Sequence, residues 1–239
     1  TMIPVEELIY EFKLTLNKVN RQDNIDIPIE DIIVYLNKAQ VSWVKTKLNP
    51  NNVYKVGYDS IRKRIDDLQI LKQSNVLLKP NKTNDLFHIG YDCPLEDAVN
   101  YMFYISSYAI GTQNKCSEPL TVDLIRHGEL TTKYLDDNYN PSFKWRTTIA
   151  TLGNDNLTVY TDGKFTVDQV YVTYLRYPLS IDVQGYVKFD GSNSVNQNCE
   201  LPEYAKSDIV DLAVKFAAQS NDNQAQAVFA EDRLIKNSE

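Results

Sequence analysis

The chain has 239 residues, enough to bury a sizeable core without help from a metal or from disulfides. It carries 25 Lys+Arg against 32 Asp+Glu, a net charge of -7 at pH 7. That balance argues against tight nucleic-acid binding through a basic face and against attraction to an anionic membrane surface.

Three helices are predicted in the first 73 residues. The first begins near Pro4, with two glutamates in its opening turn, and ends before the polar run 20–26. The second, 28–48, repeats this opening and is the strongest helix prediction, because its apolar residues recur at helical spacing along one stripe. A third is expected from residue 59 or 60 to about 71.

From residue 75 to about 182, short runs of β-branched and aromatic residues predict strands. These are 76–78, 101–110, 120–125, 145–152, 157–161 and 167–175. Between the last two, Asp162 and Gly163 suit a type I′ turn, so those strands are expected to pair as an antiparallel hairpin. Both alternating sets of side chains in 167–175 are partly apolar, which predicts cover on both faces of that strand.

A polar stretch, residues 185–198, follows the strands and predicts either a projecting hairpin or a disordered loop. Its apolar residues are Tyr186, Val187 and Phe189. After it, Leu201-Pro202-Glu203 opens a helix, and a last, weakly amphipathic helix is predicted from Asn223 to about Lys236.

The order helix, β, helix predicts an α+β fold, in which N- and C-terminal helices form an antiparallel bundle and an antiparallel β-rich region is inserted. Residues 1–74 would form the N-terminal part of the bundle and 200–239 would complete it. Residues 75–199 would form the insertion, with 185–198 as its projecting loop. A doubly wound enzyme fold is not expected, because no alternating βαβ pattern occurs.

One segment carries a catalytic motif. Arg126-His127-Gly128 follows an apolar run and resembles the RHG motif of the histidine phosphatase superfamily, in which the histidine takes the phosphate and arginines hold its oxygens. That family has a second, downstream histidine, whereas the other histidine here, His88, precedes the motif. The alternative is a strand end at which Gly128 permits a turn into a short helix, 129–135.

Other sites with chemistry are not expected. The adjacent carboxylate pairs lie mostly on predicted helical faces and are better explained as solvated charge. Two histidines and the scattered Cys93, Cys116 and Cys199 match no zinc-binding spacing, so free thiols in a reducing cytoplasm are expected. No glycine-rich phosphate loop or membrane-length apolar run is present, and no secretion leader is expected. The sequence therefore predicts a soluble protein that is not an enzyme and has no cofactor or metal.

The order and spacing of four segments resemble the podoviral head-to-tail adaptor family, also called tail tubular protein A, and most closely a ring protein of crAss-like phages. The segments are Leu36–Gln40, Asn100–Tyr108, Val170–Pro178 and Glu200–Ala213. The long segment 185–198 departs from the generic adaptor.

The resemblance implies a structural subunit of the connector ring that joins the portal to the tail. It implies a closed homo-oligomer of about a dozen copies, in contact with the portal protein and with neighbouring tail or ring proteins. Double-stranded DNA would pass through the lumen without sequence-specific binding, and the acidic balance would let it slide. The expected location is the virion neck or tail, after assembly in the host cytoplasm and without a membrane.

Contacts between subunits or rings are expected at segment 185–198 and at the C-terminal helix. The candidate interface residues are Tyr186, Val187, Phe189, Leu234 and Ile235. Two other functions stay open: a histidine-phosphatase-like phosphotransferase centred on 126–128, or a phage-encoded binding protein that is absent from the virion.

Overall fold

The computed structural model describes residues 2–19, 27–48, 67–84, 88–153, 155–188 and 191–220. Contacts divide the chain into two compact units. The helical unit comprises 1–70 and 178–239, and the sheet unit comprises 71–177. The loop segment 185–198 therefore belongs to the helical unit.

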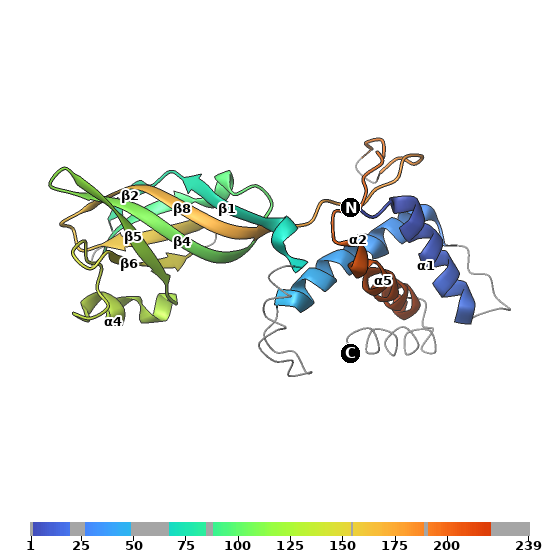
Figure 1. Cartoon of the computed structure of the whole chain (residues 1–239), viewed down its shortest axis with the longest axis horizontal. Helices are drawn as coiled ribbons and strands as arrows, with labels where there is room; N and C mark the ends of the chain where they lie inside the picture. The colour runs from blue at the N-terminus through green and yellow to red at the C-terminus, as the bar shows by residue number, and fades with distance from the viewer. Residues whose placement is uncertain are drawn as a thin grey trace. The chain divides into compact units, whose positions relative to one another are not determined.

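Three helices build the described core of the helical unit: α1 (Val5–Val19), α2 (Ile29–Leu48) and α5 (Lys206–Ser220), which follows a 3-10 turn, η4 (Glu203–Ala205) (Figure 1). All three were predicted, and α5 packs against both α1 and α2. The last predicted helix, 223–236, lies outside the described residues, as does most of the third. Only the end of that third segment is described, and it forms a 3-10 turn, η1 (Gln69–Leu71).

Polar contacts fix the helices of this unit around its apolar core. The indole Nε1 of Trp43 on α2 donates to Asp208 at the start of α5, at 3.1 Å. The ammonium of Lys206 on α5 bridges Glu7 and Glu11 on α1, both at 2.5 Å. These pairs set the helix register, while fully buried apolar side chains supply most of the stabilisation. The largest of these include Leu8, Phe12, Ile32, Leu36, Leu201 and Ile209.

The strands of the sheet unit form one eight-stranded sheet in the order β1-β8-β4-β5-β6-β7-β3-β2. They are β1 (Lys72–Leu78), β2 (Asn81–Asn84), β3 (Ile89–Pro94), β4 (Tyr101–Gln113), β5 (Cys116–Leu124), β6 (Thr147–Leu152), β7 (Asn156–Thr161) and β8 (Thr166–Arg176). All six predicted strands are present in some form. β2 and β3 were not predicted, because the NKTN of β2 is wholly polar and the IGYDCP of β3 contains glycine and proline.

The sheet is strongly curled, as Figure 1 shows. β1 and β2 stand at opposite ends of the strand order, yet only Lys79 and Pro80 separate them in the chain. Three residue steps span at most about 11 Å, so the two edges of the sheet must come close together. The concave side holds the main apolar core of the unit, which includes Leu78, Leu120, Leu157, Phe165, Val170 and Val172.

The predicted fold class was wrong. The chain is mostly a curled, mixed eight-stranded sheet, with four α-helices of 6 to 20 residues in its described part, and not a helical bundle carrying an antiparallel insertion. The terminal helices do pack together, but the β-rich runs pair across long stretches of chain into a sheet with its own core. β5 and β6 pair parallel, joined through η3 (His127–Glu129) and α4 (Leu130–Leu135).

The predicted Asp162-Gly163 hairpin was also wrong. β7 pairs with β6 and β3, whereas β8 pairs with β1 and β4, so the two strands flanking this turn are not partners. Gly163 does have a positive φ of 78°, but Asp162 does not share that conformation; its carboxylate instead accepts from Lys164 N at 2.9 Å. The tight two-residue hairpin is at Asn114-Lys115, both at positive φ, between β4 and β5.

The prediction that β8 is covered on both faces was wrong as well. Val170, Val172 and Tyr174 point into the core, while Asp168 is exposed and Tyr171 only half-buried. The pairing of β8 with β4 shifts register beside Asp168, where Ile110 pairs with Gln169 and Gly111 with Val167. A bulge of this kind inverts the side-chain alternation, so Val167 also turns inward and both alternating sets look apolar in the sequence.

Gly111 on β4 lies close to two side chains of the sheet unit's apolar core. A Cβ there would sit 2.6 Å from Leu120 Cδ1 and 3.3 Å from Phe165 Cδ2, both on buried side chains. We expect Gly111→Ala to lower the free energy of unfolding by about 1–3 kcal/mol through overpacking, measured by denaturant titration. Gly128→Ala is the control, because nothing lies within 4 Å of a Cβ at that position. Equal stability of the two variants would contradict the close packing described here.

Two broader expectations can be compared with the fold. Among the described helices, none combines the length and apolar character that crossing a membrane requires. Cys93, Cys116 and Cys199 are all free, as predicted; the first and last are buried and Cys116 is exposed.

Candidate functional site

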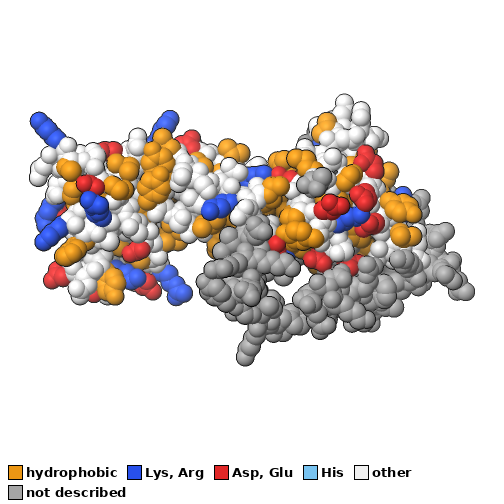
Figure 2. All heavy atoms as spheres, in the orientation of Figure 1, with side chains coloured by type: hydrophobic (Ala, Val, Ile, Leu, Met, Phe, Trp, Pro, Cys, Tyr) orange, Lys and Arg blue, Asp and Glu red, His pale blue; other side chains and the backbone are white. Residues whose placement is uncertain are grey.

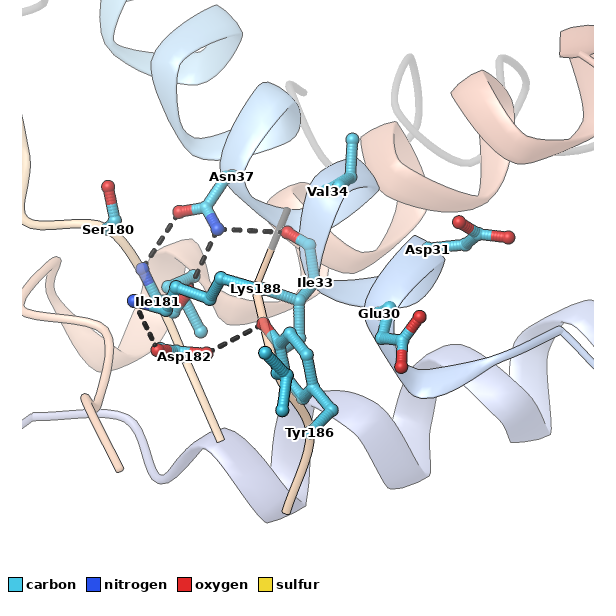
Figure 3. Close-up of a pocket in the computed structure, with 11 residues that line it drawn as sticks. Glu30, Asp31, Ile33, Val34, Asn37, Ser180, Ile181, Asp182, Tyr186 and Lys188 are labelled. Atoms are coloured by element: carbon cyan, nitrogen blue, oxygen red, sulfur yellow. Dashed lines mark hydrogen bonds and ion pairs between the residues drawn. The ribbon is translucent and has the colours of Figure 1, made fainter. Parts of the chain in front are cut away.

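A pocket of about 450 Å³ opens in the helical unit between α2 and the chain around the loop segment. We call it the α2 pocket. Glu30, Asp31, Ile33, Val34 and Asn37 of α2 form one wall. Ser180, Ile181, Asp182, Tyr186, Val187 and Lys188 form the other (Figure 3). Its volume falls within the usual range of binding sites on proteins.

Side chains of α2 and Glu200 position the chain at 179–181, beside the pocket, by hydrogen bonds to its irregular backbone. The Asn37 amide donates to Ile181 O and accepts from Ile181 N, both at 2.8 Å. Gln40 Nε2 donates to Leu179 O at 2.9 Å, and the carboxylate of Glu200 accepts from Leu179 N at 2.8 Å. These four backbone groups of Leu179 and Ile181 are thereby satisfied without any strand partner, which is what permits the burial of Ile181.

Asp182 organises the opposite wall. One carboxylate oxygen accepts from Tyr186 Oη at 2.7 Å and from Val183 N at 2.9 Å; the other accepts from Lys188 Nζ at 2.8 Å and from Val195 N at 3.1 Å. The Asp182 side chain is only 6 % exposed. A single buried carboxylate therefore joins residues 183–188 on one side of the loop to Val195 on the other.

The protonation states follow from this network. Burial alone would raise the pKa of Asp182, but the bonds from Lys188, Tyr186 and two backbone amides outweigh it and hold that pKa below its usual value. For Tyr186, burial, the bond to Asp182 and the charges of Asp182 and Glu30 together raise the pKa to about 12. At neutral pH the carboxylate is thus charged and the phenol is neutral, with the phenol donating.

The rim of the pocket combines apolar and acidic side chains. Val34 and Val187 are each 62 % exposed and supply the apolar part of this rim. Glu30 and Asp31 are exposed, at the α2 side in Figure 3, whereas the positive charge of Lys188 is already matched by Asp182. Such a surface is suited to hold an apolar group that carries a positive charge.

The structure brings together two of the five predicted interface residues. Tyr186 and Val187 line the α2 pocket, Tyr186 pointing toward Asp182 and Val187 outward to solvent. Phe189, Leu234 and Ile235 lie outside the described residues.

The RHG segment lies in the sheet unit. β5 ends at Leu124, Arg126 immediately precedes η3, and His127 is the first residue of η3. The expected strand end with a short helix after it is therefore confirmed. His127 Nε2 is 3.0 Å from Leu152 O; because a carbonyl only accepts, this nitrogen carries the proton and its lone pair is not available for attack. The other histidine, His88, is buried edge-on against Tyr134, with ring centroids 4.8 Å apart.

Metal binding finds no support in the described part of the chain, where no group of three His, Cys, Asp or Glu side chains is arranged to hold an ion. The residues that sequence reasoning missed are Asn37, Asp182 and Glu200. Each is a polar residue beside apolar ones, which is a weak signal. Asn37 and Glu200 bind backbone atoms of distant residues, and Asp182 gathers side-chain and backbone groups of its own loop.

Comparison with known proteins found no match: no model of a known family matches the sequence, and no curated protein matches it.

Proposed function

We propose that this chain is a non-catalytic structural subunit of a phage head-to-tail connector ring, which joins the portal to the tail and lines the channel for DNA. The ring would hold about a dozen copies, closed by contacts between two different faces of each subunit. Neighbouring portal, tail or ring proteins are its partners, and the assembled virion is its location.

The observation that supports this most is how the four segments of the resemblance relate in space. Asn100–Tyr108 contributes to β4, which pairs along its length with the β8 strand of Val170–Pro178. Leu36–Gln40 supplies Asn37 and Gln40, and Glu200–Ala213 supplies Glu200, which together bind the backbone of 179–181. The four segments resemble the adaptor family only in their order and spacing along the chain, yet in space they form two sets of contacting partners. A framework in common with that family would require such contacts.

The α2 pocket adds support from a second direction. A structural subunit needs preformed contact surfaces, and exposed apolar side chains on a rigid frame are typical of them. Val187 is such a side chain, on a loop tied down by Asp182, and it belongs to the segment in which the sequence departs from the generic adaptor. We assign this pocket to contacts between subunits or neighbouring rings.

Purified virions provide the test. We expect mass spectrometry to find the chain at a copy number near that of the portal protein, and images of the virion neck to show it as a cyclic ring. Absence from virions purified by density gradient, with the chain present in the lysate of infected cells, would contradict the proposal. It would favour the binding protein that acts outside the virion.

A further inference from the structure

The sheet unit displays a second unusual surface, the tight turn formed by residues 142–147, which we call the Trp145 turn. Trp145 at its tip is 71 % exposed, more than any other aromatic side chain in the described residues. Lys144 Nζ lies over its ring, 5.4 Å from the centroid. The turn therefore presents a large apolar group that carries a positive charge.

This turn is rigid, although it lies at the surface. Ser142 and Thr147 exchange two backbone hydrogen bonds of 2.9 and 3.2 Å, and Arg146 takes a left-handed φ of 54° to close the chain. The ring of Phe143 packs on the core residue Phe165, with centroids 6.0 Å apart. Arg146 also pairs with Glu118 at 3.1 Å. A side chain fixed on such a frame loses little conformational entropy when it binds, which suits a contact residue.

The Trp145 turn and the α2 pocket are complementary in chemistry. The pocket offers exposed valines for an aromatic ring and two exposed carboxylates, Glu30 and Asp31, for a cation. On the face drawn in Figure 2, acidic side chains gather over the helical unit, and several basic side chains project from the sheet unit, which carries acidic ones as well. Lys188, the cation within the pocket, is neutralised by Asp182 and does not oppose a second one.

We propose that the α2 pocket of one copy of this chain binds the Trp145 turn of the next copy, with Trp145 against Val34 and Val187 and with Lys144 beside Glu30 and Asp31. Because the two surfaces differ, the contact is heterologous. A pair of copies therefore keeps one free pocket and one free turn, so contacts repeat from copy to copy. This inference rests on the proposed ring function and names the surfaces that close the ring.

A mixing experiment with two surface variants tests this contact. Trp145→Ala removes the inserted group but keeps the pocket, and Val34→Arg blocks the pocket but keeps the turn. In sedimentation velocity, we expect wild-type chain to form larger species as its concentration rises, and each variant alone to weaken association roughly tenfold or more. An equimolar mixture should form a species of two chains and nothing larger, since only one productive pair of surfaces remains. Tyr10→Ala and Val99→Arg, at side chains that are 67 % exposed, are the matched controls and should behave as wild type.

Charge reversal tests the electrostatic part separately. Lys144→Glu and Glu30→Lys should each weaken association, and the chain that carries both changes should recover it, a result that loss of folding cannot produce. Wild-type chain that stays monomeric up to its solubility limit would overturn the inference, as would variants that associate as wild type or a mixture that stays monomeric. Such results would leave the virion test of the proposed function unaffected, and absence from virions would leave the mixing result to stand by itself.

Discussion

Replacing Asn37 with alanine should lower the free energy of unfolding of the helical unit by about 3 kcal/mol. Ile181 N and Ile181 O would both lose their partner, and a buried backbone group without a partner costs about 1–3 kcal/mol. For a chain of this size, that loss corresponds to a fall in melting temperature of roughly 6–12 °C. Trp43, which is 3 % exposed in this unit, reports its unfolding by fluorescence once Trp145 is replaced by phenylalanine.

The control for this measurement is Asn17→Ala, at an exposed position on α1 where the same chemical change removes no buried contact. It should stay within about 0.5 kcal/mol of the parent chain. Gln40→Ala should also lower the free energy of unfolding, because Leu179 O, Asn37 Oδ1 and Cys199 Sγ each lose the partner that this buried side chain provides. If Asn37→Ala is as stable as Asn17→Ala, then water replaces the side chain easily and segment 179–181 does not depend on it.

Local patterns predicted the elements of this protein much better than their arrangement. α1 and α2 follow directly from the spacing of apolar residues and from their acidic first turns, and these depend only on neighbours in sequence. The pairing of β8 with β4 and β1 depends on residues 54 to 103 positions away, on which local patterns carry no information. The Asp162-Gly163 turn shows the consequence, because a good turn sequence does not ensure that the strands beside it pair.

The candidate site was predicted only in part, for a related reason. Exposed apolar side chains in a polar segment are visible in a sequence, so Tyr186 and Val187 could be singled out. The groups that shape the pocket could not, because Asn37 binds the backbone of the distant Ile181 and Asp182 joins groups on both sides of its loop, contacts that exist only once the chain has folded. The Trp145 turn was missed because Trp145 and Arg146 were assigned to the start of a strand, 145–152, whereas β6 begins only at Thr147.

Replacing Asp182 with asparagine should loosen the loop while leaving the rest of the helical unit folded. An asparagine has one acceptor oxygen and two donor hydrogens, so it cannot accept from Lys188, Tyr186 and two backbone amides together. We expect the free energy of local opening to fall by about 2 kcal/mol or more. Hydrogen exchange at the Val195 amide, followed by NMR, should accelerate roughly 30-fold at neutral pH. Glu6→Gln, at an exposed carboxylate on α1, should leave that rate unchanged.

The dependence of this effect on pH gives a stricter test. Asp182 has a pKa below its ordinary value of 3.8 in the folded chain, so its contribution is fully present above that value and is lost as pH falls through the folded pKa. The ratio of the Asp182→Asn and wild-type exchange rates cancels the intrinsic effect of pH on exchange. It should stay constant from pH 7 to about pH 5 and approach one only in strong acid, below the ordinary range of aspartate. A ratio that already declines between pH 7 and pH 5 would mean that the folded pKa is raised, with burial outweighing the four bonds, and the order of the loop would then need another cause.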